Sequence, residues 1–271
     1  MNSRQRIFPI VLATIVATVL VGTTRFTGAD DSAKPPAPAN EKVWEPHDLN
    51  RPKPPVCDPG PGTETEFAKP PGDAILLFNG KDLSEWVRRP GQKEQPPVTG
   101  PKWRIGDGYF EVVPNGGSIY SKEKFADCRI HLEWVTPSEF KPNALGQNRG
   151  NSGVFLPSHQ ELQILDSFDN ETYADGQTAA VYGKYPPIVN VSRRPGEWQS
   201  FDITLEQPRF DANRKMTKPC TLTVIHNGVL VQDHVSIGGS TTSGTLGLQD
   251  HYTPVRFRNV WVQKIENPEQ E

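Results

Sequence analysis

From Ala74 onward, apolar and polar side chains alternate in short runs that turn residues separate. In the run 128–135, every second residue is apolar, and the residues between them include His131 and Glu133. Asn227 and Gly228 lie between two such runs, which is typical of a type I′ hairpin turn. About ten strands at this spacing predict an all-β fold: a two-sheet antiparallel jelly-roll sandwich.

A different pattern opens the chain. Arg4 and Arg6 precede an apolar run over residues 7–21, and small and polar residues follow up to Ala29. This order is typical of a secretory signal peptide. An uncleaved membrane anchor is the alternative, but a run of about 15 residues is shorter than the roughly 20 that a span needs. We expect residues 1–29 to be a signal peptide and the protein to be exported to the periplasm, the cell envelope or the medium. A membrane contact is expected only if the segment is retained.

Proline and glycine recur through residues 30–73, and no apolar period persists there. This composition predicts a Pro-rich linker or arm rather than packed structure, with Trp44 as a candidate contact to a surface. Residues 74–266 then form the predicted domain, and residues 267–271 a short tail.

The charge is −3 and the charged residues are interspersed without a basic stripe, so we expect no nucleic-acid partner. Cys57, Cys128 and Cys220 fit no zinc-ligand spacing. Either one pair of them is bridged, or Cys128 and Cys220 are small buried side chains. The sequence leaves this choice, and the oligomeric state, open.

The stretch ELQILDSF at 161–168 places Glu161 and Gln163 on one face of a strand, and Leu162 and Ile164 on the other. We expect the apolar face to pack on the second sheet. An ordinary solvated face is one interpretation of the polar side. Gln163 in mid-strand favours another, in which that face is the floor of a glycan site.

Several motifs occur in an order that resembles the 3-keto-disaccharide hydrolase domain family. They are LLFNGKDLSEWV (76–87), WRIGDGYFEV (103–112), RGNSGVFL (149–156), ELQILDSF (161–168), YADGQTAAVYGKYPP (173–187), PGEWQSFDI (195–203), LQDH (248–251) and PVRFRNVWV (254–262). The resemblance covers residues 74–265 and implies a concanavalin A-like jelly roll that binds glycans on its concave sheet. Tyr252 departs from the family, whose members often have glycine there.

The resemblance also implies a chemistry. A ketone at C3 of a sugar acidifies the C2 proton, so a base can remove that proton while an acid assists departure of the C1 oxygen. His251 is the candidate base and Glu161 the candidate acid, with Asp166 as a third catalytic candidate at the strand end. Each has a structural alternative: a surface-loop histidine, a solvated carboxylate and a turn-capping aspartate.

Seven further residues are candidates for binding the sugar: Gln163, Arg149, Asn151, Trp198, Gln249, Asp250 and His131. Trp198 is alternatively a core indole. His131 joins the site only if its face of the strand is the concave one. Glu161, Asp166, Asp250 and His251 together have the chemistry of a divalent-cation site, but no spacing requires one. No other cofactor is expected.

The leading interpretation is an exported carbohydrate-active enzyme, a 3-keto-disaccharide or 3-keto-glycoside hydrolase working by general acid/base chemistry on a carbohydrate substrate. A non-catalytic glycan-binding jelly-roll module is the first alternative, because the same curved sheet can recognise a sugar without cleaving it. A structural cell-surface domain is the second.

Overall fold

The computed structural model describes residues 43–60, 69–89, 100–140 and 144–266. Contacts separate residues 1–43 from the unit that begins at Trp44, and that second unit is described here. The expected signal peptide and C-terminal tail lie outside the described residues. Within the described ranges, no helix is long and apolar enough to cross a membrane.

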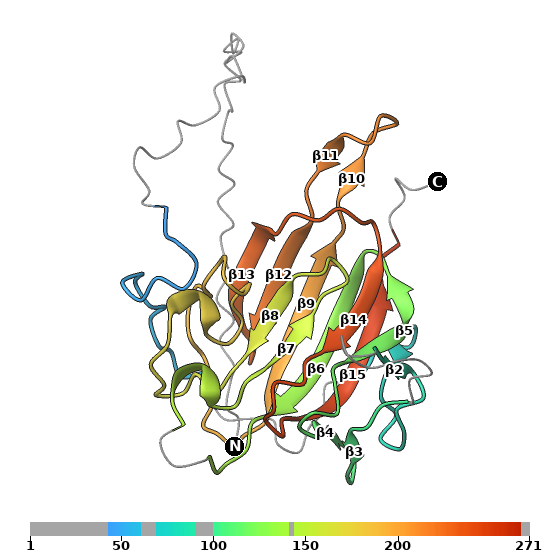
Figure 1. The fold of residues 1–271 in the computed structure, drawn as a ribbon. Coiled ribbons are helices and arrows are strands. Elements are labelled where there is room, and N and C mark those ends of the chain that lie inside the picture. The colour runs from blue at the N-terminus through green and yellow to red at the C-terminus, as the bar shows by residue number, and fades with distance from the viewer. Residues whose placement is uncertain (1–42, 61–68, 90–99, 141–143, 267–271) are drawn as a thin grey trace, which may run out of the picture. The chain divides into compact units, whose positions relative to one another are not determined.

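Two antiparallel sheets build the domain (Figure 1). The strands of the larger sheet are β1 Ile75–Leu76, β3 Arg104–Ile105, β4 Phe110–Glu111, β6 Cys128–Val135, β9 Gln199–Glu206, β12 Thr221–His226, β13 Val229–Ser236 and β15 Arg256–Lys264. Seven of its eight strands run in the order β13-β12-β9-β6-β15-β4-β3. The eighth strand, β1, pairs with β15.

The second sheet has five strands in the order β2-β5-β14-β7-β8. They are β2 Trp86–Arg88, β5 Ile119–Phe125, β7 Ser152–Phe155, β8 Glu161–Ile164 and β14 Gly244–Leu248. A separate hairpin pairs β10 Arg209–Phe210 with β11 Met216–Lys218. The only helices among the described residues are two 3-10 turns, η1 Gly146–Asn148 and η2 Ala174–Gly176. The predicted all-β sandwich is confirmed.

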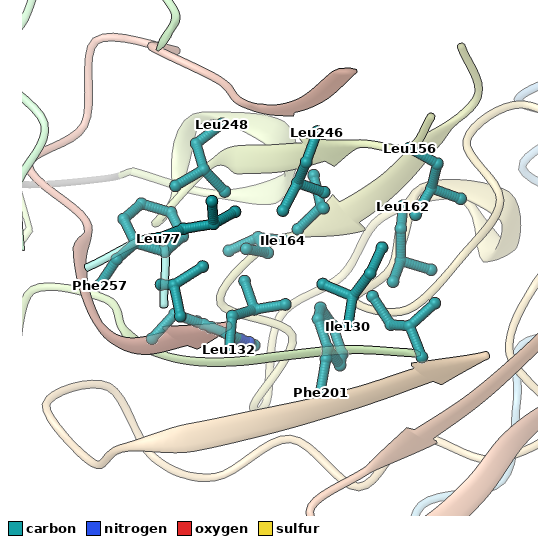
Figure 2. Packing of buried hydrophobic residues seen from close by; sticks show 14 of the residues in the cluster. Leu77, Ile130, Leu132, Leu156, Leu162, Ile164, Phe201, Leu246, Leu248 and Phe257 are labelled. Atoms are coloured by element: carbon teal, nitrogen blue, oxygen red, sulfur yellow. The ribbon is translucent and has the colours of Figure 1, made fainter. Parts of the chain in front are cut away.

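The core lies between the two sheets, where the alternation of each strand aims its apolar side chains (Figure 2). Ile130 and Leu132 of β6 belong to the same buried cluster as Leu162 and Ile164 of β8, and all four are almost fully buried. Burying such a side chain stabilises the fold by about 1.5–3 kcal/mol. A one-residue slip would turn it to solvent, so the register is strongly specified. The predicted apolar face of β8 is therefore confirmed.

Local predictions also hold. Asn227 and Gly228, between β12 and β13, have φ angles of 51° and 81°, as a type I′ turn requires. All three cysteines are free, with Cys57 exposed and Cys128 and Cys220 buried. Burial raises the pKa of the Cys128 thiol to about 12. Of the two open alternatives, small buried side chains are correct and a bridged pair is wrong.

The Pro-rich arm differs from its prediction. Residues 44–60, drawn in blue in Figure 1, form turns and irregular segments that pack on the domain. Val56 forms a parallel bridge with Asn190, the Cys57 N–H donates to the Asn190 carbonyl at 2.9 Å, and the Asn190 N–H donates to the Pro55 carbonyl at 2.8 Å. These contacts use main-chain groups, so no apolar period in the sequence reveals them.

Candidate active site

The outer face of the five-stranded sheet carries a row of paired residues: Glu161 of β8, Phe155 of β7, Gly247 of β14 and Tyr120 of β5. The rings of Tyr120 and Phe155 stack at 5.9 Å with an interplanar angle of 10°. They lie over Gly247, where a Cβ would be only 2.7 Å from the Tyr120 ring. Glycine at this position therefore lets two aromatic rings form a platform beside the Glu161 carboxylate.

Glu161 is the carboxyl group of this face whose pKa is shifted by burial. Its carboxylate lies over Gly153, where a Cβ would be 2.4 Å from Oε1. Burial raises the pKa of Glu161 to about 7, against an opposing hydrogen bond from the Gln249 side chain. A carboxyl group with this pKa holds a transferable proton near neutral pH, which is the property expected of a catalytic acid.

Side-chain amides surround Glu161. Gln163 Nε2 donates to Gln147 Oε1 at 2.8 Å, and Asn151 Nδ2 donates to the Gln147 carbonyl at 2.8 Å. The Oε1 atoms of Gln163 and Gln249 are buried and accept no hydrogen bond from any described residue. An unsatisfied buried acceptor costs about 1–3 kcal/mol, so these two oxygens are suited to receive hydroxyl groups of a ligand.

A pair of phenols closes the β8 side of the site. Val181 bridges to Leu162 and points into the core, so its neighbour Tyr182 is on the outer face with Glu161. The Tyr182 N–H donates to the Glu161 carbonyl at 3.0 Å. The hydroxyls of Tyr182 and Tyr173 are 2.6 Å apart. Burial, together with this hydrogen bond, raises the pKa of Tyr173 above its usual range, so the Tyr173 phenol stays neutral.

Arg149 and Asp166 form an ion pair behind the amides. Arg149 Nε is 2.5 Å from Asp166 Oδ2, and the Phe168 N–H donates to Asp166 Oδ1 at 3.1 Å. Gly150 has a φ of 64°, and a Cβ there would be 2.7 Å from Thr136 and 2.9 Å from Asp166. Glycine at position 150 therefore allows close packing of the loop against Thr136 and Asp166, rather than close approach of a ligand. Both Asp166 oxygens hold the loop, so we assign Asp166 and Arg149 to positioning rather than to proton transfer or sugar binding.

Asp250 also holds a turn. Its Oδ2 accepts the Gly117 N–H at 2.9 Å and its Oδ1 accepts the Tyr252 N–H at 3.0 Å. The carboxylate is half-buried and each oxygen can accept a second hydrogen bond, so the predicted sugar contact stays a prediction. His251, between Asp250 and Tyr252, is half-buried, with its ring 6.0 Å from that of Tyr252. It makes no hydrogen bond to the described part of the chain. Its predicted role as base stays a prediction.

The structure does not assemble the four residues that the sequence offered as a possible cation site. Among the described residues, no group of three or more His, Cys, Asp or Glu side chains could hold a metal ion. Glu161 interacts with Gln249, Asp166 with Arg149, and Asp250 with backbone N–H groups. These four candidate ligands, His251 included, do not fit a divalent-cation site.

His131 and Trp198 belong to the other side of the sandwich. His131 projects from the outer face of the larger sheet, where its Nδ1 is 2.6 Å from Asp202 Oδ1. Burial favours the neutral ring, but hydrogen bonds to Asp202 and Glu133 outweigh it and raise the pKa of His131 to about 9. Trp198 covers the Arg258 guanidinium at 3.9 Å and lines a pocket of about 310 Å³. Placing these two residues with Glu161 was wrong. The alternation along a strand shows which side chains share a face, but it does not show to which of the two sheets the strand belongs.

The sequence analysis missed seven residues of the site: Gln147, Gly153, Tyr173, Tyr182 and the platform residues Tyr120, Phe155 and Gly247. Tyr173 and Tyr182 lie in YADGQTAAVYG, which contributed to the family resemblance only as a string. Gly153 and Gln147 lie in or beside RGNSG. Their positions around Glu161 depend on the pairing of β7 with β8, which neither motif encodes.

Comparisons with known proteins identify the family of this chain. The model of the 3-keto-alpha-glucoside-1,2-lyase-like domain family matches residues 73–263. A 3-keto-disaccharide hydrolase of Bacteroides thetaiotaomicron is 24% identical over 244 residues, covering 71% of this chain and 78% of that protein.

Two crystal structures from Parabacteroides distasonis, both provisionally assigned as glycosyl hydrolases, are also similar. The first has a TM-score of 0.63 and 34% identity, covering 78% of this chain and all of that one. The second has a TM-score of 0.52 and 20% identity, covering 72% and 94%, and supports the fold alone. These relatives make the protein a glycosyl hydrolase-like, carbohydrate-active protein. The chain belongs to the 3-keto-alpha-glucoside-1,2-lyase-like domain family.

Proposed function

We propose that this protein is an exported enzyme that cleaves 3-keto-glycosides by general acid/base chemistry at Glu161. The observation that carries the proposal is the pKa of Glu161, which burial raises to about 7. The family of 3-keto-alpha-glucoside-1,2-lyase-like domains and the Bacteroides 3-keto-disaccharide hydrolase supply the substrate class.

The proposed reaction begins at the carbon next to the ketone. A base takes the C2 proton, and the electron pair of that C–H bond forms the C1–C2 double bond as the C1–O bond breaks. The departing oxygen takes a proton from the catalytic acid. Addition of water across the double bond then completes a net hydrolysis.

Glu161 in its protonated form is our candidate for the acid, because its pKa keeps the proton available near neutrality. His251 is the candidate base. Its support is the family resemblance and its place two residues after Gln249, whose side chain donates a hydrogen bond to Glu161.

The surrounding groups suit a sugar. The stacked Tyr120 and Phe155 rings offer an apolar surface for a sugar ring. The free Oε1 atoms of Gln163 and Gln249 can accept sugar hydroxyls. This combination would also serve a non-catalytic glycan-binding module, which remains the second candidate because binding alone needs no titratable group.

The test uses a chromogenic 4-nitrophenyl 3-keto-glucoside and its unoxidised parent. We expect selective release of nitrophenol from the keto form, with kcat falling as the pH rises above about 7, where Glu161 loses its proton. Glu161→Gln and His251→Ala should each lower kcat by about 10²–10⁴-fold, the usual worth of acid/base catalysis.

Glu85→Gln, at an exposed position, is the matched control and should keep wild-type activity. Binding of the keto sugar without turnover of either glycoside would support the glycan-binding module instead. Equal turnover of the keto and parent sugars would exclude elimination chemistry.

A further inference from the structure

The Pro-rich arm docks directly behind the phenol pair. The His47 ring lies 4.2 Å from the Tyr173 ring and 4.9 Å from the Tyr182 ring. The His47 N–H donates to Asp175 Oδ2 at 3.0 Å, and its Nδ1 is 3.6 Å from Asp175 Oδ1. One arm residue therefore contacts both phenols and a carboxylate of η2.

Asp175 explains why the arm binds there. Its side chain is fully buried, and a buried carboxylate is costly unless hydrogen bonds or opposite charges compensate it. In the described part of the chain, its donor and cationic neighbours come from the arm: the His47 N–H and the Arg51 guanidinium at 3.9 Å. Arg51 also donates to the Lys184 carbonyl at 3.0 Å. The arm thus supplies a hydrogen bond and a cationic neighbour to a buried carboxyl group.

The segment between these contacts is part of the site. Tyr182 shares the outer face with Glu161, and the Gly176 carbonyl accepts a hydrogen bond from Gln147 at 2.9 Å. The Gly183 N–H donates to the Asp175 carbonyl at 3.0 Å, so the acid that binds the arm also closes the turn after Tyr182. Residues 173–183 therefore contact both the arm and the strand that carries Glu161.

We propose that His47 and Arg51 of the arm complete the sugar-binding site by holding the Tyr173–Tyr182 pair as a fixed wall beside Glu161. The inference rests on the proposed function and goes beyond it, because the family match begins only at residue 73. His47 is a positioning residue: it acts on substrate binding through the phenols and takes no part in proton transfer.

The kinetic test compares full-length wild type with His47→Ala, using the same 3-keto-glucoside. Loss of the ring, which packs at a tilt against both phenols, should raise KM by about tenfold, the equivalent of one aromatic contact, and leave kcat and its pH profile unchanged. His47→Phe keeps an aromatic ring and the backbone N–H, so it should restore most of the affinity. Leu49→Ala, at an exposed arm position, is the control.

Hydrogen exchange without sugar gives an independent measure. In His47→Ala, the amides of residues 173–183 should exchange faster than in wild type, while Leu49→Ala should not change them. If the wild type cleaves no 3-keto-glycoside, the proposed function fails and exchange alone decides whether the arm fixes the wall. Unchanged exchange in His47→Ala, or an unchanged KM in an active enzyme, would overturn the proposal.

Discussion

Replacing Glu161 by glutamine should make the protein more stable at alkaline pH, because the native fold disfavours the ionised carboxylate. Burial raises the pKa of Glu161 to about 7 in the folded protein, against an ordinary value of 4.5 in an unfolded chain. Each pKa unit corresponds to about 1.4 kcal/mol, so the full shift is worth about 3 kcal/mol. Glu161 retains some solvent contact, so we expect about 2 kcal/mol.

The sign follows from proton binding. Below pH 4.5, Glu161 is protonated in both states and contributes no pH dependence. Between pH 4.5 and about 7, the unfolded chain ionises first, so wild-type stability falls as pH rises. Above this window both states are ionised, and the penalty is present in full. Glutamine has nearly the same shape and does not titrate, so it escapes the penalty.

Urea unfolding followed by tryptophan fluorescence at pH 4 and pH 8 measures the effect. The free energy of unfolding of Glu161→Gln minus that of wild type should grow by about 2 kcal/mol between the two pH values. Subtracting wild type removes the contributions of all other titrating groups. The exposed Glu85→Gln control should show no such growth. A difference for Glu161→Gln that is constant, or that shrinks with pH, would refute a raised pKa.

Three further predictions concern packing around the site. Gly153→Ala places a Cβ 2.4 Å from Glu161 Oε1, so it should displace the Glu161 carboxylate. We expect kcat to fall by about 100-fold while the circular dichroism spectrum stays native. A wild-type kcat would show that the position of the Glu161 carboxylate is unimportant. Asp166→Ala leaves the Arg149 guanidinium without its carboxylate and should cost about 3 kcal/mol in urea unfolding, and a loss below about 1 kcal/mol would contradict a structural ion pair. Trp198→Ala should destabilise the fold by about 3 kcal/mol. It should keep KM for the keto sugar within about twofold, because Trp198 lies on the opposite face of the sandwich from Glu161. A tenfold rise in KM would place the sugar beside Trp198 instead.

Positions that depend on strand parity could be predicted in advance. Leu162 and Ile164 point into the core, and Glu161 and Gln163 point out of it, as the alternation of ELQILDSF indicates. Parity is a property of one strand and needs no knowledge of its neighbours. The Asn227-Gly228 turn is equally local, since two consecutive residues with positive φ are enough to specify it.

Positions that depend on which strands become neighbours could not be predicted. His131 and Glu161 both occupy polar faces of alternating strands, yet they lie on opposite sides of the sandwich. Asp166 and Asp250 look like reactive carboxylates in the sequence, and both are occupied by hydrogen bonds from groups distant in the chain. His47 reaches the site from outside the predicted domain.

By itself, the sequence determined the all-β class, the inward and outward faces of individual strands, the hairpin turn and the family. Each of these follows from short-range periodicity, from adjacent turn residues or from ordered motifs. The tertiary structure alone decided which polar residues share a face, how far burial shifts the pKa of Glu161, and that the arm packs beside the site. These properties depend on long-range strand pairing and on the exclusion of water by segments remote in the chain, and neither is encoded in the spacing of residues along it.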